Sequence, residues 1–230
     1  MVLDFAKEAI ENTATHSINF DELKAGKANI KVIGVGGAGC NAVTWLYNKG
    51  INGATVYGTN TDALHLSITK ADDKILLGKE LTRGLGCGGY PAKGREAAKE
   101  SLSEIKKFVS SADMVFVLTG EGGGTGTGAA PVVAQLAKET GAVVIGVVTM
   151  PFDCEKARID KAEFGLQELR EVTDTVIVID NNRLVDIAGN LPIEQAFAVA
   201  NELISTMIKG IVETITLPSL INLDYADVSA

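Results

Sequence analysis

The sequence predicts an α/β fold: a Rossmann-like, three-layer arrangement in which helices cover both faces of one parallel sheet, with a long central helix at the end. Short apolar, β-branched runs alternate along the chain with segments of helical periodicity. Strands of a parallel sheet read as continuous apolar runs because helices bury both of their faces. Two glycine-rich turns that join strand to helix, and one uninterrupted helical pattern near the end, complete the prediction.

The first half of the chain contains three predicted strands. Residues 30–35 form an apolar run, and the helix that follows its glycine turn ends at Gly50, a residue type common at helix C-termini. Residues 54–59 predict a second strand, and residues 74–77 predict a weaker third. Residues 94–109 carry apolar side chains on one side of a single amphipathic helix. This alternation predicts the first half of the sheet.

The second half continues in the same way. Residues 113–119 predict a buried strand, and a second glycine turn leads to a helix at 129–140. Pro131 is expected in the first turn of that helix, where a backbone N–H is not needed. Two more strands are predicted at residues 142–149 and 175–179, and the helix between them at residues 160–172.

A long helical pattern lies between Pro192 and Pro218. About 24 residues at 1.5 Å each give a helix of about 36 Å, which is long for a helix that flanks a sheet. We expect part of its apolar side to be exposed. The predicted organisation is an amphipathic arm (1–28), an α/β domain (29–191), the long helix (192–217) and the last residues (218–230).

Composition excludes several classes of protein. The 230 residues are 46% hydrophobic and 22% charged, which is typical of a folded chain with a sizeable core. The net charge of −8 argues against general nucleic-acid binding. The sequence has no apolar run long enough to span a bilayer, and its first residues do not resemble a secretory signal. We therefore expect a cytoplasmic protein without nucleic-acid binding or membrane insertion.

The cysteines and histidines predict neither a metal site nor a disulfide framework. Cys40, Cys87 and Cys154 are far apart in the sequence, and the two histidines, His16 and His65, are isolated from one another. Reduced cysteines in a cytoplasmic protein are the expected state.

The first glycine turn, Gly34-x-Gly36-x-x-Gly39, leaves a strand and opens a helix. Glycines allow close approach of a phosphate, and the free N–H groups and dipole of the helix attract anions. The spacing also fits a dinucleotide-binding fingerprint, with Asp62 near the expected ribose position. A plain tight turn has the same spacing, so this motif alone leaves an NAD-dependent oxidoreductase open.

The second glycine turn, at residues 120–128, also lies between a buried strand and a helix. Two such turns at the carboxyl edge of one sheet suit a nucleoside triphosphate, whereas a dinucleotide fold needs only one. Neither turn contains a lysine or a GxxxxGK[ST] motif, so Mg²⁺ and backbone dipoles must offset the phosphate charge. Thr125 and Thr127 offer hydroxyl groups. A third glycine cluster, at residues 84–91, either closes over the phosphates or is a solvent-exposed loop.

The segment GGGTGTG at residues 122–128 is the signature of the tubulin/FtsZ family of GTPases, and the sequence resembles the FtsZ branch of that family from about residue 28 to its end. Further matching motifs are GGAGCN at 36–41, NTD at 60–62, TRGLGCGG at 82–89, Pro151-Phe152 and Asn222-x-Asp224-x-x-Asp227. Several motifs in the same order make a chance similarity a poor explanation.

The resemblance implies a binding site for GTP or GDP, with Mg²⁺ accompanying GTP. Residues in contact with the phosphates and ribose would be Gly36, Gly37, Ala38, Gly39, Cys40 and Asn41. The phosphate cradle would consist of Gly120, Gly123, Gly124, Thr125 and Gly126. The ribose region would be held by Glu155 and Arg158, and the guanine would be contacted by Asn181, Phe197 and Asn201. The i, i+4 spacing of Phe197 and Asn201 places both on one helix face.

The resemblance also implies that catalysis takes place between two molecules. Asn222, Asp224 and Asp227 would form a synergy loop that reaches the γ-phosphate of the next subunit in a head-to-tail filament. Carboxylates there would orient the attacking water. The expected activity is a division GTPase that acts at mid-cell.

The sequence departs from the family pattern at several positions. Glu121 replaces an apolar residue beside the phosphates, Tyr90 replaces an asparagine, and Asn201 replaces the more usual aspartate. The segment that contains Glu155 and Arg158 is one residue shorter than usual. Glu121 should repel phosphate unless its side chain points away or binds a metal ion.

The family's second α+β domain and its tail, which binds division partners, are missing from this sequence. We therefore expect this chain to bind GTP or GDP with little self-assembly or turnover. A capping or regulatory GTP-binding protein without hydrolysis is the alternative, and an oxidoreductase is a remote one.

Overall fold

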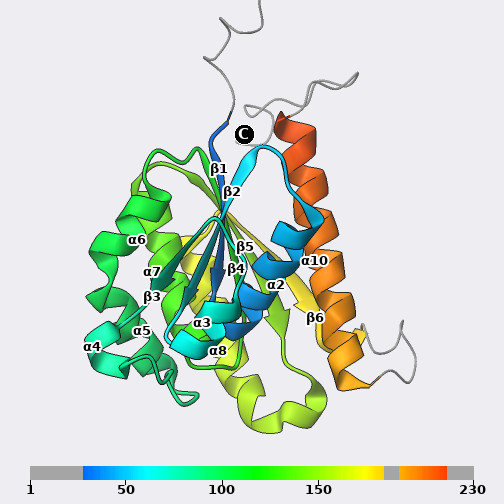
Figure 1. The fold of residues 1–230 in the computed structure, drawn as a ribbon. Coiled ribbons are helices and arrows are strands. Elements are labelled where there is room, and N and C mark those ends of the chain that lie inside the picture. Colours follow the sequence, from blue (N-terminus) through cyan, green and yellow to red (C-terminus); the bar gives the residue numbers. More distant parts are fainter. Residues whose placement is uncertain (1–27, 184–191, 217–230) are drawn as a thin grey trace, which may run out of the picture.

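The computed structural model describes residues 28–183 and 192–216, and these ranges form a parallel α/β sandwich (Figure 1). Six strands form one sheet in the order β3-β2-β1-β4-β5-β6, and every neighbouring pair is parallel. The strands are β1 (Ile30–Val35), β2 (Ala54–Asn60), β3 (Asp73–Leu76), β4 (Met114–Gly120), β5 (Val143–Met150) and β6 (Thr175–Asp180). The predicted fold class is confirmed.

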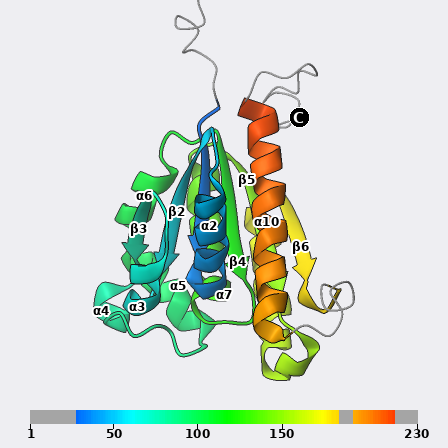
Figure 2. The same ribbon diagram turned by 45° about the vertical axis from the view of Figure 1, so that its right-hand side comes forward.

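Helices cover both faces of this sheet. The helices are α2 (Gly36–Lys49), α3 (Ala63–Ile68), α4 (Lys79–Thr82), α5 (Pro91–Glu100), α6 (Leu102–Val109), α7 (Thr125–Glu139), the 3-10 helix η1 (Asp153–Arg158), α8 (Ile159–Val172) and α10 (Ile193–Thr216). Figure 2 shows α2 and α10 side by side in front of the sheet. The helices α5, α6, α7 and α8 pack against the opposite face of the sheet. The three-layer prediction is therefore confirmed.

The alternation of side chains along the central strands explains how both layers are held. In β4, Met114 and Phe116 pack toward α2 and α10, whereas Val115 and Val117 pack toward the helices on the other face. All four side chains are fully buried. Successive residues of a strand point to opposite faces, so a run that is apolar throughout fills two cores at once.

The long helix α10 lies on the sheet beside α2. Its buried side, which includes Ala200, Ile204 and Ile208, belongs to the same core as β1 and β4. Val199 and Leu203 remain 37% and 47% exposed, so part of its apolar side is exposed, as expected.

Two predicted helices differ in the structure. The segment 94–109 lies in two helices, α5 and α6, because Ser101 leaves helical geometry between them. The Ser101 hydroxyl accepts the N–H of Gly78, and its carbonyl accepts the N–H groups of Glu104 and Ile105. Ser101 therefore links the loop at Gly78 to the start of α6, and as a result α5 and α6 do not form one continuous helix.

The helix after the second glycine turn begins at Thr125 rather than at residue 129, so Pro131 lies inside α7 and not in its first turn. Glycines disfavour helix in isolation, but close packing requires them here. A Cβ atom on Gly126 would lie 2.6 Å from the carbonyl oxygen of Gly120, and one on Gly128 would overlap the carbonyl oxygen of Pro91. At Gly126 and Gly128, close packing against neighbouring segments outweighs the low helix propensity of glycine.

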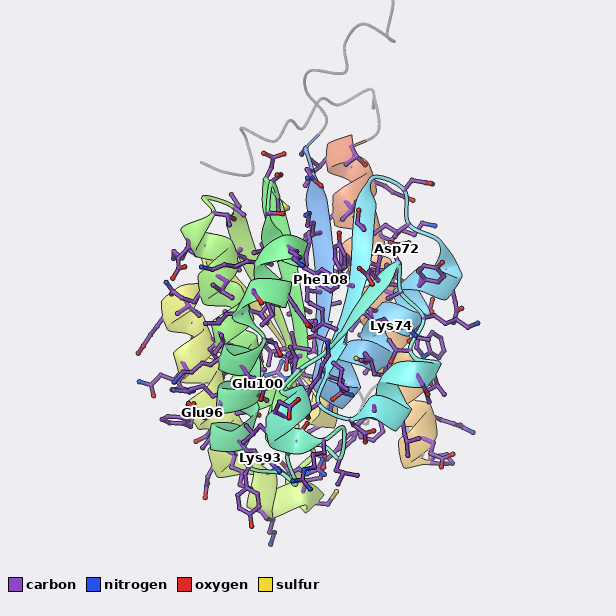
Figure 3. The ribbon with its side chains drawn as sticks, turned by 60° about the vertical axis from the view of Figure 1, so that its left-hand side comes forward. Asp72, Lys74, Lys93, Glu96, Glu100 and Phe108 are labelled. Atoms are coloured by element: carbon purple, nitrogen blue, oxygen red, sulfur yellow. The ribbon has the colours of Figure 1, made fainter. Side chains whose placement is uncertain are left out.

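The short helices α3, α4 and η1 are absent from the sequence prediction. Figure 3 shows Glu100 of α5, whose carboxylate accepts the N–H groups of Glu80 and Leu81 at the start of α4. The N-terminus of α4 is thus capped from a neighbouring helix, a contact that no local pattern reveals.

Replacing Gly128 by alanine should destabilise the fold by about 2 kcal/mol or more, because the new methyl group collides with the backbone of α5. Chemical unfolding measures the change. The matched control is Gly210→Ala in α10, where nothing lies within 4 Å and alanine should stabilise the helix slightly. Equal unfolding free energies for the two variants would contradict the packing argument.

Candidate functional site

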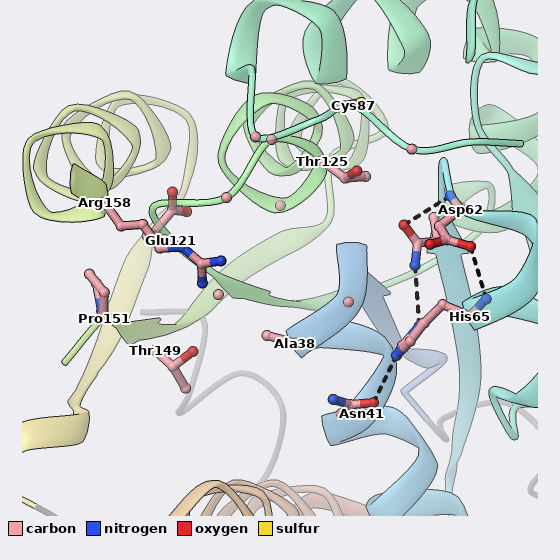
Figure 4. Close-up of a pocket in the computed structure, with 18 of the residues that line it drawn as sticks. Ala38, Asn41, Asp62, His65, Cys87, Glu121, Thr125, Thr149, Pro151 and Arg158 are labelled. Atoms are coloured by element: carbon pink, nitrogen blue, oxygen red, sulfur yellow. Dashed lines mark hydrogen bonds between the residues drawn. The ribbon is translucent and has the colours of Figure 1, made fainter. Parts of the chain in front are cut away.

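A pocket of about 600 Å³ lies at the carboxyl ends of the strands, where ligands bind in open α/β sheets (Figure 4). It is formed by the start of α2, the end of β2, all three glycine clusters, the end of β5, η1 and the N-terminal part of α10. The volume is suitable for a nucleotide-sized molecule.

The first glycine turn brings the N-terminus of α2 into this pocket. Gly36, with φ of +72°, follows β1 directly, and a Cβ atom there would lie 2.7 Å from the backbone nitrogen of Gly126. A Cβ atom on Gly39 would overlap the carbonyl oxygen of Leu118 in β4. The two glycine turns therefore contact each other, and only residues without a side chain allow this approach.

The N-termini of α2 and α7 both face the pocket without competing acceptors. In the described structure neither helix has a side-chain cap, and neither carries an acidic residue in its first turn. Free N–H groups and the positive end of each helix dipole are thus available to an anion. Gly37, Ala38 and Asn41 line the pocket from α2, and Gly124, Thr125 and Gly126 line it at the start of α7.

The third glycine cluster forms part of the pocket wall. Gly86, Gly88 and Gly89 line the pocket. The hydroxyls of Thr61 and Thr125 are 2.6 Å apart, and that of Thr61 also lies 3.3 Å from the sulfur of Cys87. Of the two readings of this cluster, closure beside the second turn is the one that the structure supports. Tyr90 is 69% exposed and does not line the pocket.

The far end of the pocket combines an aromatic ring with a free amide oxygen. Phe197 of α10 is 40% exposed and contacts the buried Phe152 edge to face, with ring centroids 5.2 Å apart. Asn181, directly after β6, is 4% exposed, and its Oδ1 atom has no hydrogen-bond partner in the described structure. A planar ligand group with N–H donors would fit both features.

Glu155 and Arg158 line the pocket from η1. Their side chains form an ion pair of 2.7 Å, and Glu155 also accepts the N–H of Phe152 at 3.2 Å. Arg158 is exposed, so its guanidinium keeps donors for a ligand. The shortened segment still places both residues at the pocket.

The structure brings most predicted site residues together. Those that line the pocket are Gly37, Ala38, Asn41, Gly120, Gly123, Gly124, Thr125, Gly126, Glu155, Arg158, Asn181 and Phe197. Gly36 and Gly39 lie behind the lining, in the contact between the turns. Asn201 is half-buried on α10 and does not line the pocket. Asn222, Asp224, Asp227 and most of the arm at 1–28 lie outside the described residues.

Cys40 does not face the pocket. Its side chain is fully buried, and its sulfur lies 3.5 Å from the carbonyl oxygen of Thr59. Burial raises the pKa of the Cys40 thiol to about 11. The expectation of a ligand contact is therefore not met by this side chain, which packs α2 against β2.

Several lining residues were missed by the sequence analysis. Thr149 lines the pocket near the end of β5, and Pro151 lines it directly after this strand. His65, which was considered isolated, lines it beside Asp62. A signal was available for His65. It follows the end of the second strand by a few residues, and carboxyl ends of parallel strands share one edge of the sheet.

Glu121 is among the residues that line the pocket, but its carboxylate lies against α7 and α8 (Figure 4). It is 5% exposed, and a Cβ atom on Gly165 of α8 would overlap its carboxylate. Neither carboxylate oxygen has a hydrogen-bond partner in the described structure. Burial raises the pKa of Glu121 to about 7, the nearby Thr127 hydroxyl opposes the shift, and the charge of Glu168 adds to it. The expected repulsion of phosphate is thereby avoided.

Residues 29–189 match the family described as the tubulin/FtsZ family, GTPase domain. The chain belongs to this family. The match includes both glycine turns and the third glycine cluster, which a dinucleotide-binding fold does not explain. No observation favours the remote alternative of an oxidoreductase.

Individual relatives support the same assignment. The chain is 52% identical to "Cell division protein FtsZ 2" of Methanocaldococcus jannaschii over 100% of its own length and 60% of the relative. It is 59% identical to "Cell division protein FtsZ 1" of Archaeoglobus fulgidus, over 88% of this chain and 55% of the relative. The solved "FtsZ dimer, empty" of M. jannaschii superimposes with a TM-score of 0.88 and 52% identity, covering 91% of this chain and 62% of that one. This family member thus spans little more than half the length of these relatives.

The described ranges contain neither a membrane-spanning helix nor a cluster of metal ligands. No helix within them is long and apolar enough to cross a membrane. They also contain no group of three or more His, Cys, Asp or Glu residues arranged to hold a metal ion.

The buried carboxyl of Glu121 makes stability depend on pH. Because its pKa rises from 4.5 to about 7 on folding, the folded state keeps a proton that the unfolded state loses. The contribution of Glu121 to stability is therefore fully present below pH 4.5 and is lost as pH rises toward and through 7. Relative to Glu121→Gln, the wild-type chain should lose about 2 to 3 kcal/mol between pH 5 and pH 8.

Urea unfolding of both chains at the two pH values measures this difference. Glu163→Gln on the exposed side of α8 is the matched control and should give the same difference at both pH values. A pH-independent offset for Glu121→Gln would contradict the raised pKa.

Proposed function

We propose that this chain binds GTP and GDP in the pocket at the carboxyl edge of the sheet, as the nucleotide-binding part of a division GTPase. The observation that carries the proposal is the pair of uncapped helix N-termini, α2 and α7, that face one pocket across touching glycine turns. A phosphate chain offers an anion to both helices, whereas a single phosphate group needs only one.

The remainder of the pocket suits a guanine nucleoside. We place the base between Phe197 and Asn181, where the ring supplies a stacking surface and the free amide oxygen accepts N–H donors of the base. The ribose then lies near Glu155 and Arg158. Asn201 contacts the base only if its side chain turns toward the pocket on binding.

Mg²⁺ fits the pocket as a companion of the nucleotide rather than as a resident ion. In the described structure the pocket offers hydroxyls and separate carboxylates, and no cluster of acidic ligands. Mg²⁺ keeps several waters and binds through phosphate oxygens with one or two protein ligands, and Thr125 and Asp62 are the candidates here. When bound, the ion would offset phosphate charge in turns that contain no lysine.

We further propose that hydrolysis requires a second molecule of the full-length protein. Asn222, Asp224 and Asp227 would reach the nucleotide of the next subunit and orient the attacking water. The full-length protein would assemble head to tail in the cytoplasm at the division site, and its other regions would bind division partners. Residues 1–230 alone would bind nucleotide with little assembly or turnover.

Binding is tested by calorimetric titration of the nucleotide-free chain with GTP and GDP in Mg²⁺, and in parallel with ATP and NADH. Guanine nucleotides should bind more tightly than the others. Phe197→Ala should weaken GDP binding by about tenfold or more, because base stacking is lost. Leu203→Ala, on the same helix, 47% exposed and outside the pocket, is the matched control. Equal loss in both variants, or equal affinity for ATP, argues against this base site.

Turnover is tested by phosphate release from GTP. Residues 1–230 alone should release phosphate far more slowly per molecule than a full-length relative, because the active site is proposed to form between two complete subunits. The same rate in both proteins, unchanged on dilution, is the result that excludes an intermolecular site.

A further inference from the structure

A chain of hydrogen bonds links the end of β2 to the pocket through His65. It begins at Asn60, which is buried and whose Oδ1 accepts the backbone N–H groups of Thr61 at 2.8 Å and Asp62 at 3.3 Å. Two backbone donors fix the orientation of this amide, because a flipped amide would set N–H against N–H. The Nδ2 group of Asn60 is therefore the donor that remains.

The remaining donor of Asn60 determines the tautomer of His65. Asn60 Nδ2 lies 3.3 Å from His65 Nδ1, so Nδ1 acts as the acceptor. The proton of the neutral ring is then on Nε2. His65 Nε2 lies 3.1 Å from Oδ1 of Asn41, and this amide oxygen accepts the proton (Figure 4).

The backbone of His65 is also held at both ends. Its N–H donates to Oδ1 of Asp62 at 3.0 Å, and its carbonyl accepts the Thr69 hydroxyl at 2.9 Å. Lys74, which donates to the carbonyls of Leu66 and Thr69, fastens the C-terminal end of α3. The imidazole ring is thus presented to Asn41 by a short helix that is fixed at both ends.

The orientation of the Asn41 amide follows from this series of hydrogen bonds. Once Oδ1 accepts from His65, the Nδ2 group of Asn41 is the part of its amide left to donate, and Asn41 and His65 both line the pocket. An amide that could rotate freely would present its oxygen to an anion as readily as its N–H groups. We propose that His65 is a positioning residue that turns the Asn41 amide so that it donates to an oxygen of the bound nucleotide, an inference that rests on the proposed function.

Calorimetric titration with GDP tests the proposal in a double-mutant cycle. Asn41→Ala and His65→Ala should each weaken binding by about tenfold, the effect of losing a hydrogen bond to a charged group. The double variant should bind no more weakly than Asn41→Ala alone, because His65 acts only through Asn41. Leu64→Ala, which is 82% exposed on the same helix and outside the pocket, should bind like the wild type.

The choice of ligand distinguishes the two kinds of oxygen. With 2′,3′-dideoxy-GDP, a loss that persists in His65→Ala assigns the contact to a phosphate, and a loss that disappears assigns it to the ribose. Wild-type binding of GDP with no loss in His65→Ala, or additive losses in the double variant, overturns this proposal alone. A wild-type chain that binds no nucleotide contradicts the proposed function as well.

The tautomer gives a readout that does not depend on any variant of the site. In the neutral form of the wild-type ring, nitrogen-15 NMR should show one proton-bearing nitrogen, Nε2, and an unprotonated Nδ1. The chain has two histidines, so the spectrum of His16→Gln assigns the signals of His65. A ring protonated on Nδ1, or averaged between tautomers, contradicts the hydrogen-bond chain.

Discussion

The contact between the two glycine turns is the constraint on which the rest of the pocket depends. Gly36 and Gly126 approach so closely that a single methyl group would separate them, and Gly39 is held equally close to β4. This approach places the N-termini of α2 and α7 side by side at the carboxyl edge of the central strands. The third glycine cluster then packs against the second turn, where a Cβ atom on Gly124 would lie 2.8 Å from the Cβ atom of Cys87. A looser contact would leave two separate anion sites in place of one.

Much of the fold could be predicted because each strand can be recognised from its own residues, without knowledge of its distant contacts. Every predicted strand overlaps an observed one, since a run that is apolar on both faces has few alternatives to a covered parallel sheet. The long helix was predicted for a similar reason, because its periodicity is continuous. The positions that failed were those decided by distant contacts. Ser101 interrupts a helix to receive an N–H from Gly78, and α7 starts early because its glycines pack on α5 and β4.

The candidate site divides in the same manner. The glycine turns, Phe197 and Asn181 were accessible through motif resemblance, and the structure places them around one pocket. The burial and the orientation of individual side chains could not be predicted from the sequence. The sequence alone does not reveal that Cys40 faces the core, that the Glu121 carboxylate lies between α7 and α8, or that Asn60 directs His65 toward Asn41. Each of these features depends on which neighbouring elements a side chain contacts, and these contacts are determined only when the whole chain is folded.

The uncapped helix N-termini have a consequence for how this pocket tolerates mutation. Every amino acid except proline supplies the same backbone N–H, so an anion site built from such groups does not depend on the chemistry of any one side chain. Positions such as Gly37 and Gly123, where a Cβ atom meets nothing within 4 Å, have room to vary. Positions such as Gly36, Gly39 and Gly126 do not. Sequence drift in these turns is therefore limited by space rather than by charge or by hydrogen-bonding capacity.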